Sequence, residues 1–140
     1  MSITANELRF GNVVIEKVLG ECEVRQIGKE WAAVRKFGDT ANYTIDINNL
    51  SPIPLDASVL ERCGFRTWGH SKQISTLVVS DLMNLEFTRK SENSEDGFTI
   101  RWSDGIVEGE YADIPVPITS LHQLQNLYFS LTGKDLEYKP

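Results

Sequence analysis

Two proline-containing segments divide the chain into alternating strand-like and helix-like stretches. They are Pro52-Ile53-Pro54-Leu55 and Pro115-Val116-Pro117-Ile118. Proline fixes its own φ and has no backbone N–H, so neither segment continues a central strand or a helix interior. Strand-like runs precede each segment and a helix-like run follows it. The two helix-like runs do not otherwise resemble each other, which indicates a shared strand-to-helix transition rather than a duplication.

The stretch before the first proline segment predicts short antiparallel strands. Val, Ile and aromatic residues recur at short intervals and Gly, Asn and Asp separate the runs, as in successive hairpins. Such a unit is small-barrel-like, although the pattern does not decide whether the barrel closes. The runs are 12–19, 22–27, 31–37 and 43–47.

A short helix is predicted directly after the first proline segment. Asp56 is placed to cap its N-terminus, and Leu55 and Leu60 can pack across that cap. Gly64 stands where a left-handed residue ends a helix, and Phe65 can fold back on Leu60.

Strand patterns return after this helix, over 66–111. Residues 74–79, 82–88, 98–102 and 106–111 read as strands, and Asp104-Gly105 is a strong hairpin turn. The polar segment 91–96 reads as a loop.

The final helix is predicted from Ser120 to Thr132. Ser120 and Gln123 form a capping-box pattern, and Gly133 is the expected stop. At 100° per residue one apolar face must pack on the core, which we expect to be the second sheet. That face comprises Leu121, Leu124, Leu127, Tyr128 and Leu131.

Length and composition predict one globular α+β domain over 1–140, with a β subunit at 1–51 and the helices and second sheet at 52–140. The chain has 140 residues, of which 41% are hydrophobic and 24% charged. It lacks a membrane-length apolar run and a basic, apolar leader, so we expect a cytoplasmic protein with no membrane partner and reduced cysteines.

The charge balance disfavours nucleic acid as a partner. The formal net charge is −6, the second half is the more acidic, and no basic stripe is present. Phosphate backbones are bound by clustered Lys and Arg.

No motif for catalysis, a cofactor or a metal is found. The glycine-rich phosphate loops and the GxSxG elbow are absent. Cys22, Cys63, His70 and His122 have no zinc-ligand spacing. We therefore expect no catalytic, cofactor-binding or metal-binding residues.

A strip on the last helix is the candidate partner-binding site. His122, Gln125, Asn126 and Phe129 lie outside the apolar face and the caps, and they combine an aromatic ring with polar groups, as binding surfaces do. Arg9 and Asn12, in a turn before the first strand, also lack an evident folding role. The competing interpretation is that these side chains serve the fold. Trp31 and Trp102, on strand patterns, are expected in the core, whereas Trp68-Gly69-His70 poses the same choice as the strip.

Three motifs resemble a family of short uncharacterised proteins from bacterial genomes and their phages. They are ELRxGN at Glu7–Asn12, a PIPL-helix-GF pattern from Pro52 to Phe65, and HQLQNLYFxLTG at His122–Gly133. The stretch 66–117 departs from the family and is longer than in its usual members. The resemblance implies a genomic setting rather than a mechanism.

These observations favour a non-catalytic binding protein, a phage or mobile-element accessory factor that acts on a host protein. The alternative is sequestration of a small anionic or nucleotide-like ligand, which would need Arg9, Arg35, Arg66 or Arg101 to converge on a pocket. An enzyme of unknown class is the third hypothesis. The sequence indicates no oligomeric state.

Overall fold

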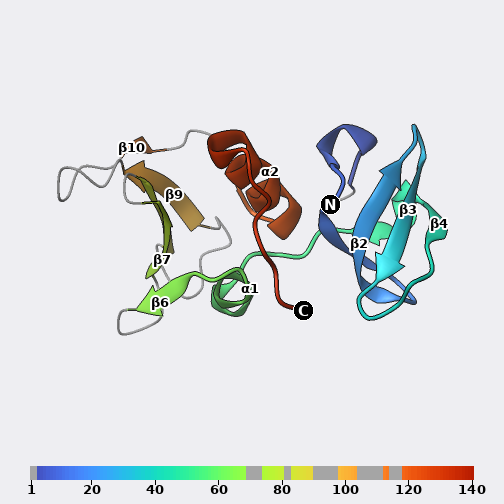
Figure 1. The fold of residues 1–140 in the computed structure, drawn as a ribbon, viewed down its shortest axis with the longest axis horizontal. Coiled ribbons are helices and arrows are strands. Elements are labelled where there is room, and N and C mark those ends of the chain that lie inside the picture. Colours follow the sequence, from blue (N-terminus) through green and yellow to red (C-terminus); the bar gives the residue numbers. More distant parts are fainter. Residues whose placement is uncertain (1–2, 69–73, 81–82, 90–97, 104–111, 114–117) are drawn as a thin grey trace. The chain divides into compact units, whose positions relative to one another are not determined.

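The computed structural model confirms the α+β class and forms two compact units, each with its own sheet (Figure 1). The first unit comprises 1–54, 120–136 and 140, and the second comprises 55–119 and 137–139. The structure describes residues 3–68, 74–80, 83–89, 98–103, 112–113 and 118–140.

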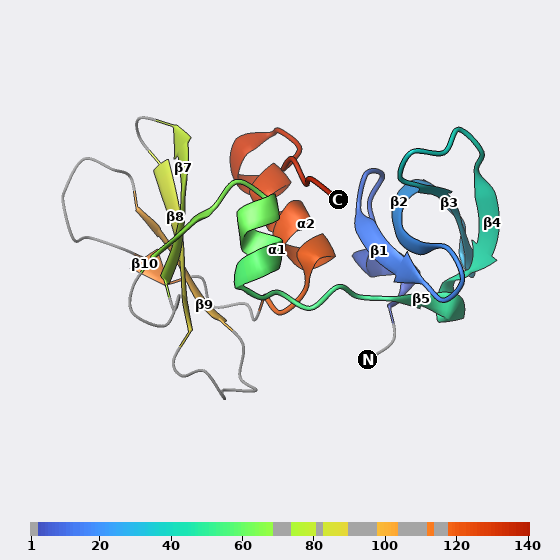
Figure 2. The ribbon, with the colours of Figure 1, turned by 90° about the horizontal axis from the view of Figure 1, so that it is seen from below.

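The first unit contains a five-stranded antiparallel sheet in the order β4-β3-β2-β1-β5, which curls as it is followed from β1 to β4 (Figure 2). A 3-10 turn, η1 (Ala5–Glu7), precedes it, and a second, η2 (Ile47–Asn49), leads into its last strand. β1 pairs with both β2 and β5, whereas β4 and β5 form the edges within the described residues. The strands are β1 (Val13–Glu16), β2 (Gly20–Ile27), β3 (Trp31–Lys36), β4 (Tyr43–Asp46) and β5 (Leu50–Ser51).

The concave face of this sheet holds the core of the first unit. Val14 pairs with Cys22 and Val24 pairs with Val34, so these buried side chains share one face. The register shifts between Val24 and Gln26, and this bulge explains why apolar alternation slips by one residue before Ile27. The cluster of buried residues is Ile3, Leu8, Val14, Cys22, Val24, Ala32, Val34, Ile47 and Leu50.

The prediction that Trp31 is a core residue is wrong. Its side chain is 38% exposed at the start of β3. The indole lies against Gly28, where an added Cβ would collide with the ring. Trp31 therefore covers the β2–β3 turn from outside. Trp102 lies in β9, but its side chain is outside what the structure describes.

The second unit begins with α1 (Ala57–Arg62), and its predicted caps are confirmed. The Asp56 carboxylate accepts a hydrogen bond from the Val59 N–H at 2.8 Å. Gly64 has φ +90°, and the Phe65 N–H donates to the Leu60 carbonyl at 3.0 Å, as in a Schellman motif.

The sheet of the second unit is antiparallel, in the order β10-β9-β8-β7-β6. The predicted Asp104-Gly105 turn, the strand 106–111 and the polar loop 91–96 lie outside the described residues, as do Gly69 and His70. The strands are β6 (Arg66–Trp68), β7 (Ile74–Ser80), β8 (Met83–Arg89), β9 (Phe98–Ser103) and β10 (Ala112–Asp113).

The last helix, α2 (Leu121–Thr132), ends as predicted but packs differently from the prediction. Gly133 follows it in the left-handed conformation, with φ 71°. The Ser120 side chain makes no capping hydrogen bond. The helix belongs to the first unit rather than to the second sheet, where the Leu121 N–H donates to the Ile53 carbonyl at 2.9 Å. Polar contacts with residues 7–13, described below, account for this placement.

Both cysteines are free and buried. Burial raises the pKa of the Cys63 thiol to about 12 and also raises that of Cys22. Thiolate is the reactive form, so these environments suppress nucleophilic chemistry. None of the described helices is long and apolar enough to cross a membrane.

Candidate functional site

The turn before β1 is shaped by its own Gly and Asn. Gly11 has φ +89°, a conformation that glycine adopts without a Cβ penalty. The Asn12 side-chain oxygen accepts from the Arg9 N–H at 2.7 Å, and the Asn12 N–H donates to the Arg9 carbonyl at 3.1 Å. The Gly11 N–H donates to the Val24 carbonyl at 2.8 Å. The turn is therefore fixed internally and against β2.

Gln125 of α2 binds the backbone on both sides of this turn. Its side-chain oxygen accepts from the Val13 N–H at 2.8 Å, and its amide nitrogen donates to the Gly11 carbonyl at 3.2 Å. The side chain is buried. It therefore satisfies two backbone groups that no strand partner serves.

Asn126 extends the same connection by one residue. Its amide nitrogen donates to the Glu7 carbonyl at 2.7 Å, and its oxygen accepts from the Asn12 amide at 2.9 Å. Asn12 is itself buried, so this amide pair lies largely away from water. The ELRxGN and HQLQNLYFxLTG motifs are thus two sides of one intramolecular contact.

This geometry corrects the expectation that His122 and Gln125 lie outside the buried face of the last helix. Both are buried, together with Leu121 and Leu124, whereas Leu127, Tyr128 and Leu131 are only half-buried. The apolar pattern alone misplaced the buried face because it assigned polar side chains to solvent. The partners of Gln125 are backbone groups more than a hundred residues away in sequence.

His122 is a buried histidine with one unpartnered nitrogen. It is 2% exposed, and its Nδ1 lies 3.2 Å from the Ser120 hydroxyl oxygen. Its Nε2 has no hydrogen-bond partner among the described residues. Desolvation lowers the pKa of this imidazole, and the Glu7 carboxylate opposes that shift. His122 is therefore neutral at pH 7.

We expect His122 to make stability depend on pH. Its folded-state pKa is below the unfolded value of about 6.5, so the unfolded chain binds more protons as pH falls below that value. Stability is then fully present above pH ~6.5 and falls at lower pH, by at most about 1.4 kcal/mol per pH unit. Urea unfolding at pH 7.5 and 5.5 should show a larger loss for the parent than for His122→Gln. Equal losses would contradict this assignment.

Two arginine–phenylalanine pairs remain at the surface around the same turn. The Arg9 guanidinium carbon lies 3.8 Å from the centroid of the Phe129 ring, and that of Arg25 lies 4.5 Å from the centroid of Phe10. Phe10 is 57% exposed and Phe129 is 37% exposed. We call Arg9, Phe10, Arg25 and Phe129 the Arg–Phe surface.

Phe10 and Arg25 were not among the residues predicted to bind a partner. Phe10 occupies the variable position of ELRxGN. An aromatic residue inside a Gly/Asn turn could have indicated an exposed ring, because such a turn does not bury a large side chain. Arg25 lies at the bulge of β2 and pairs with Glu23 through Nη1 at 2.8 Å. No local pattern indicates that Arg25 reaches the Phe10 ring.

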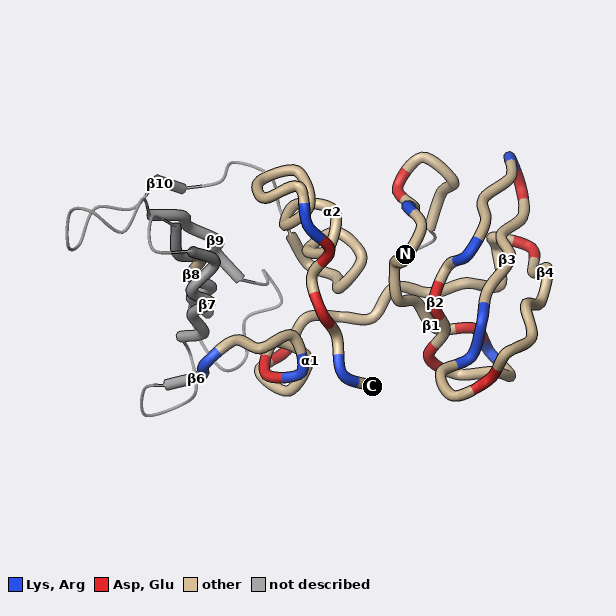
Figure 3. The backbone as a smooth tube through the Cα atoms, viewed as in Figure 1, with Lys and Arg blue, Asp and Glu red and all other residues tan. Residues whose placement is uncertain are grey.

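The other arginines considered for an anion site are Arg35, Arg66 and Arg101. Arg35 donates from Nε to the Asn42 side-chain oxygen at 2.9 Å. Arg66 belongs to the second unit, and the Arg101 side chain is not described. In the first unit, basic and acidic residues are interspersed rather than gathered (Figure 3).

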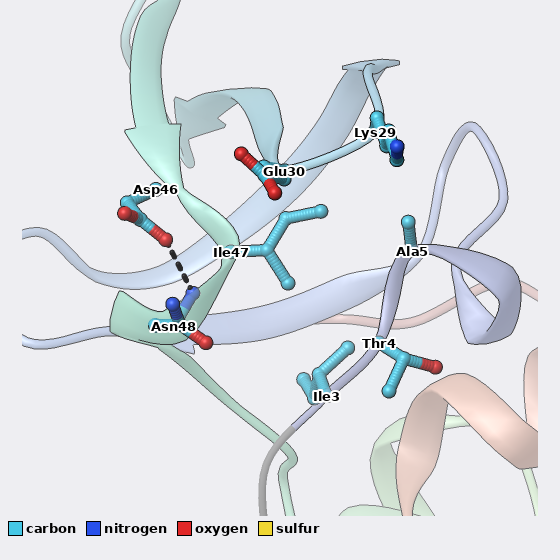
Figure 4. Close-up of a pocket in the computed structure, with 8 residues that line it drawn as sticks. All are labelled: Ile3, Thr4, Ala5, Lys29, Glu30, Asp46, Ile47 and Asn48. Atoms are coloured by element: carbon cyan, nitrogen blue, oxygen red, sulfur yellow. Dashed lines mark hydrogen bonds between the residues drawn. The ribbon is translucent and has the colours of Figure 1, made fainter.

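A shallow pocket of about 390 Å³ lies elsewhere in the first unit, between η1 and η2 (Figure 4). The side chains of Lys29, Glu30 and Asp46 stand around it, and the Asp46 carboxylate accepts from the Asn48 N–H at 2.9 Å. Acidic groups at the rim disfavour an anionic ligand here. No group of three or more His, Cys, Asp or Glu residues in the described part of the chain could hold a metal ion.

Comparisons with known proteins found no matching family model, curated protein or solved structure.

Proposed function

We propose that the chain is a non-catalytic binding protein that contacts a partner protein through the Arg–Phe surface. The observation that carries this proposal is the pair of exposed phenyl rings, each with a guanidinium over its face. Aromatic residues and arginine are enriched where protein interfaces concentrate their binding energy. The resemblance to bacterial and phage proteins supports a host protein as the partner, and hence an accessory role.

The support beneath this surface favours binding through a preorganised shape. We infer that the first sheet acts as a small-barrel-like scaffold, because β1 pairs with both β2 and β5. The turn that carries Arg9 and Phe10 is tied to β2 and to α2 through Asn12, Gln125 and Asn126. A surface that is ordered before it binds loses less conformational entropy on association.

The six residues first considered for partner binding therefore divide into two roles in this proposal. Arg9 and Phe129 contact the partner. Asn12, Gln125 and Asn126 support this surface from beneath through their hydrogen bonds, and His122 supports the start of α2 through its contact with Ser120.

Phe10→Ala is expected to reduce partner capture strongly without unfolding the protein. Phe10 is mostly exposed, so its truncation should change stability by about 0.5 kcal/mol or less. Loss of an interface anchor typically costs more than 1 kcal/mol, or upwards of ~5-fold in affinity. The measurement is quantitative mass spectrometry of proteins retained from bacterial lysate by the immobilised parent and the variant.

Val18→Ala is the matched control. Val18 is an even more exposed apolar residue, at the β1–β2 turn and at the opposite end of that hairpin from Arg25. It should retain whatever the parent retains. The proposal requires at least one protein that the parent and Val18→Ala both retain and that Phe10→Ala loses. If there is no such protein, the proposed function is wrong.

A further inference from the structure

We infer that the Arg–Phe surface recognises a protein segment in which carboxylates alternate with apolar side chains. This inference rests on the proposed function and specifies the chemistry of its partner. It rests on the stacking and hydrogen bonding of the Arg9 guanidinium and on the charges around that group.

Arg9 presents a guanidinium whose face is covered and whose edge is available. The Phe129 ring lies against the face at 3.8 Å, and the backbone N–H of Arg9 is used within the turn. Within the described residues the guanidinium forms no ion pair and donates no hydrogen bond to a side chain. A stacked guanidinium keeps its in-plane N–H donors directed outward, in the fork that matches a carboxylate.

Arg25 differs from Arg9 because it already has a carboxylate partner. Its Nη1 donates to Glu23 at 2.8 Å, so this pair contributes no net charge to the surface. The net positive charge of the surface therefore comes from Arg9. We assign the first carboxylate of the bound segment to Arg9 and expect Arg25 to contribute mainly through its stack on Phe10.

The negative net charge of the whole chain favours one class of anionic partner over another. The formal net charge of −6 repels an extended polyanion such as nucleic acid, whose binding grows with the number of phosphates neutralised. A short acidic segment carries fewer charges and is repelled less, so attraction to Arg9 can outweigh that repulsion. The exposed phenyl rings stacked with the arginines suit apolar neighbours of that carboxylate, which phosphate backbones lack.

The test is fluorescence anisotropy of the full chain with a labelled peptide of alternating Asp and Leu. A matched peptide carries Asn in place of each Asp, and a single-stranded DNA oligonucleotide is the third probe. The parent should bind the Asp peptide at least ~10-fold more tightly than the Asn peptide. Arg9→Gln should remove that preference, and added salt should weaken it.

Arg62→Gln is the control variant. Arg62 also lies over an aromatic ring, at 5.8 Å from the Tyr138 centroid, but in the second unit. Arg62→Gln removes the same charge from the chain as Arg9→Gln does, and it should leave the preference for the Asp peptide intact. Equal loss in both variants would indicate a general charge effect and would overturn the inference.

The other outcomes are also decisive. Equal binding of the Asp and Asn peptides, or binding of neither, would overturn the inference of an acidic partner. The proposed function would still stand in that case if capture from lysate depends on Phe10. Arg9-dependent DNA binding would replace the acidic segment by a nucleic acid. Parent self-association that Arg9→Gln abolishes, measured by sedimentation, would identify a second copy as the occupant. Retention of an unnamed protein does not by itself support the acidic segment.

Discussion

Replacing Gln125 by alanine is expected to lower the free energy of unfolding by about 2–4 kcal/mol. The side chain is buried and satisfies the Val13 N–H and the Gly11 carbonyl. Its removal leaves the Val13 N–H, which is buried, without a partner at a cost of about 1–3 kcal/mol, and the part-buried Gly11 carbonyl without one at the lower end of that range, about 1 kcal/mol. Chemical denaturation of the full chain, followed by circular dichroism, measures the change.

Gln125→Met separates the hydrogen bonds from the packing. Methionine has a similar length and volume, so it keeps apolar contact but offers neither the amide donor nor a strong acceptor. It should lose most of what alanine loses. If Gln125→Met is as stable as the parent, the two hydrogen bonds contribute little and the side chain acts by filling space.

Local signals were sufficient to predict the two α-helices and most of the longer strands, but not the 3-10 turns or the two-residue strands β5 and β10. Asp56 and Gly64 mark both ends of α1, and each feature depends on neighbours within a few residues. Gly133 ends α2 in the same way. The slip in alternation before Ile27 corresponds to a bulge in β2. Such features are read from short windows because the chemistry that causes them is confined to short windows.

The packing of the last helix could not be read from such windows. Gln125 and Asn126 contact residues 7–13, more than a hundred positions earlier in the chain. The two motifs were each visible, but nothing within either one indicates that they pair. The prediction that Trp31 is buried failed for a different reason: the indole lies against nearby Gly28, and the strand pattern does not indicate that contact.

The sequence indicated which residues belong to the candidate site better than it indicated what those residues do. Subtracting the apolar stripe and the caps found residues that have a special task, but subtraction does not say whether the task is folding or binding. The structure gives Asn12, Gln125 and Asn126 intramolecular partners. Their assignment to a partner-binding strip stays a prediction, and we propose the Arg–Phe surface as its exposed part.

Leu124→Ala is expected to destabilise the protein by about 2–5 kcal/mol, the range for truncating a fully buried leucine. Leu124 is completely buried on α2, next to Gln125. The cavity left behind adds to the lost transfer free energy, because a packed helix relaxes only partly. Domains of this size are stabilised by about 5–15 kcal/mol in total, so the variant should melt well below the parent.

Leu127→Ala is the matched control because it removes the same atoms from the same helix at a half-buried position. The half-buried Leu127 side chain buries less apolar area than Leu124 does, so its truncation should cost clearly less than Leu124→Ala. Helix propensity changes equally in both variants and cancels in the comparison. An equal or reversed order of the two melting temperatures would mean that α2 is rotated from the orientation described here. The amide contacts of Gln125 and Asn126 would then fail with it, since both depend on the same helix face pointing toward residues 7–13.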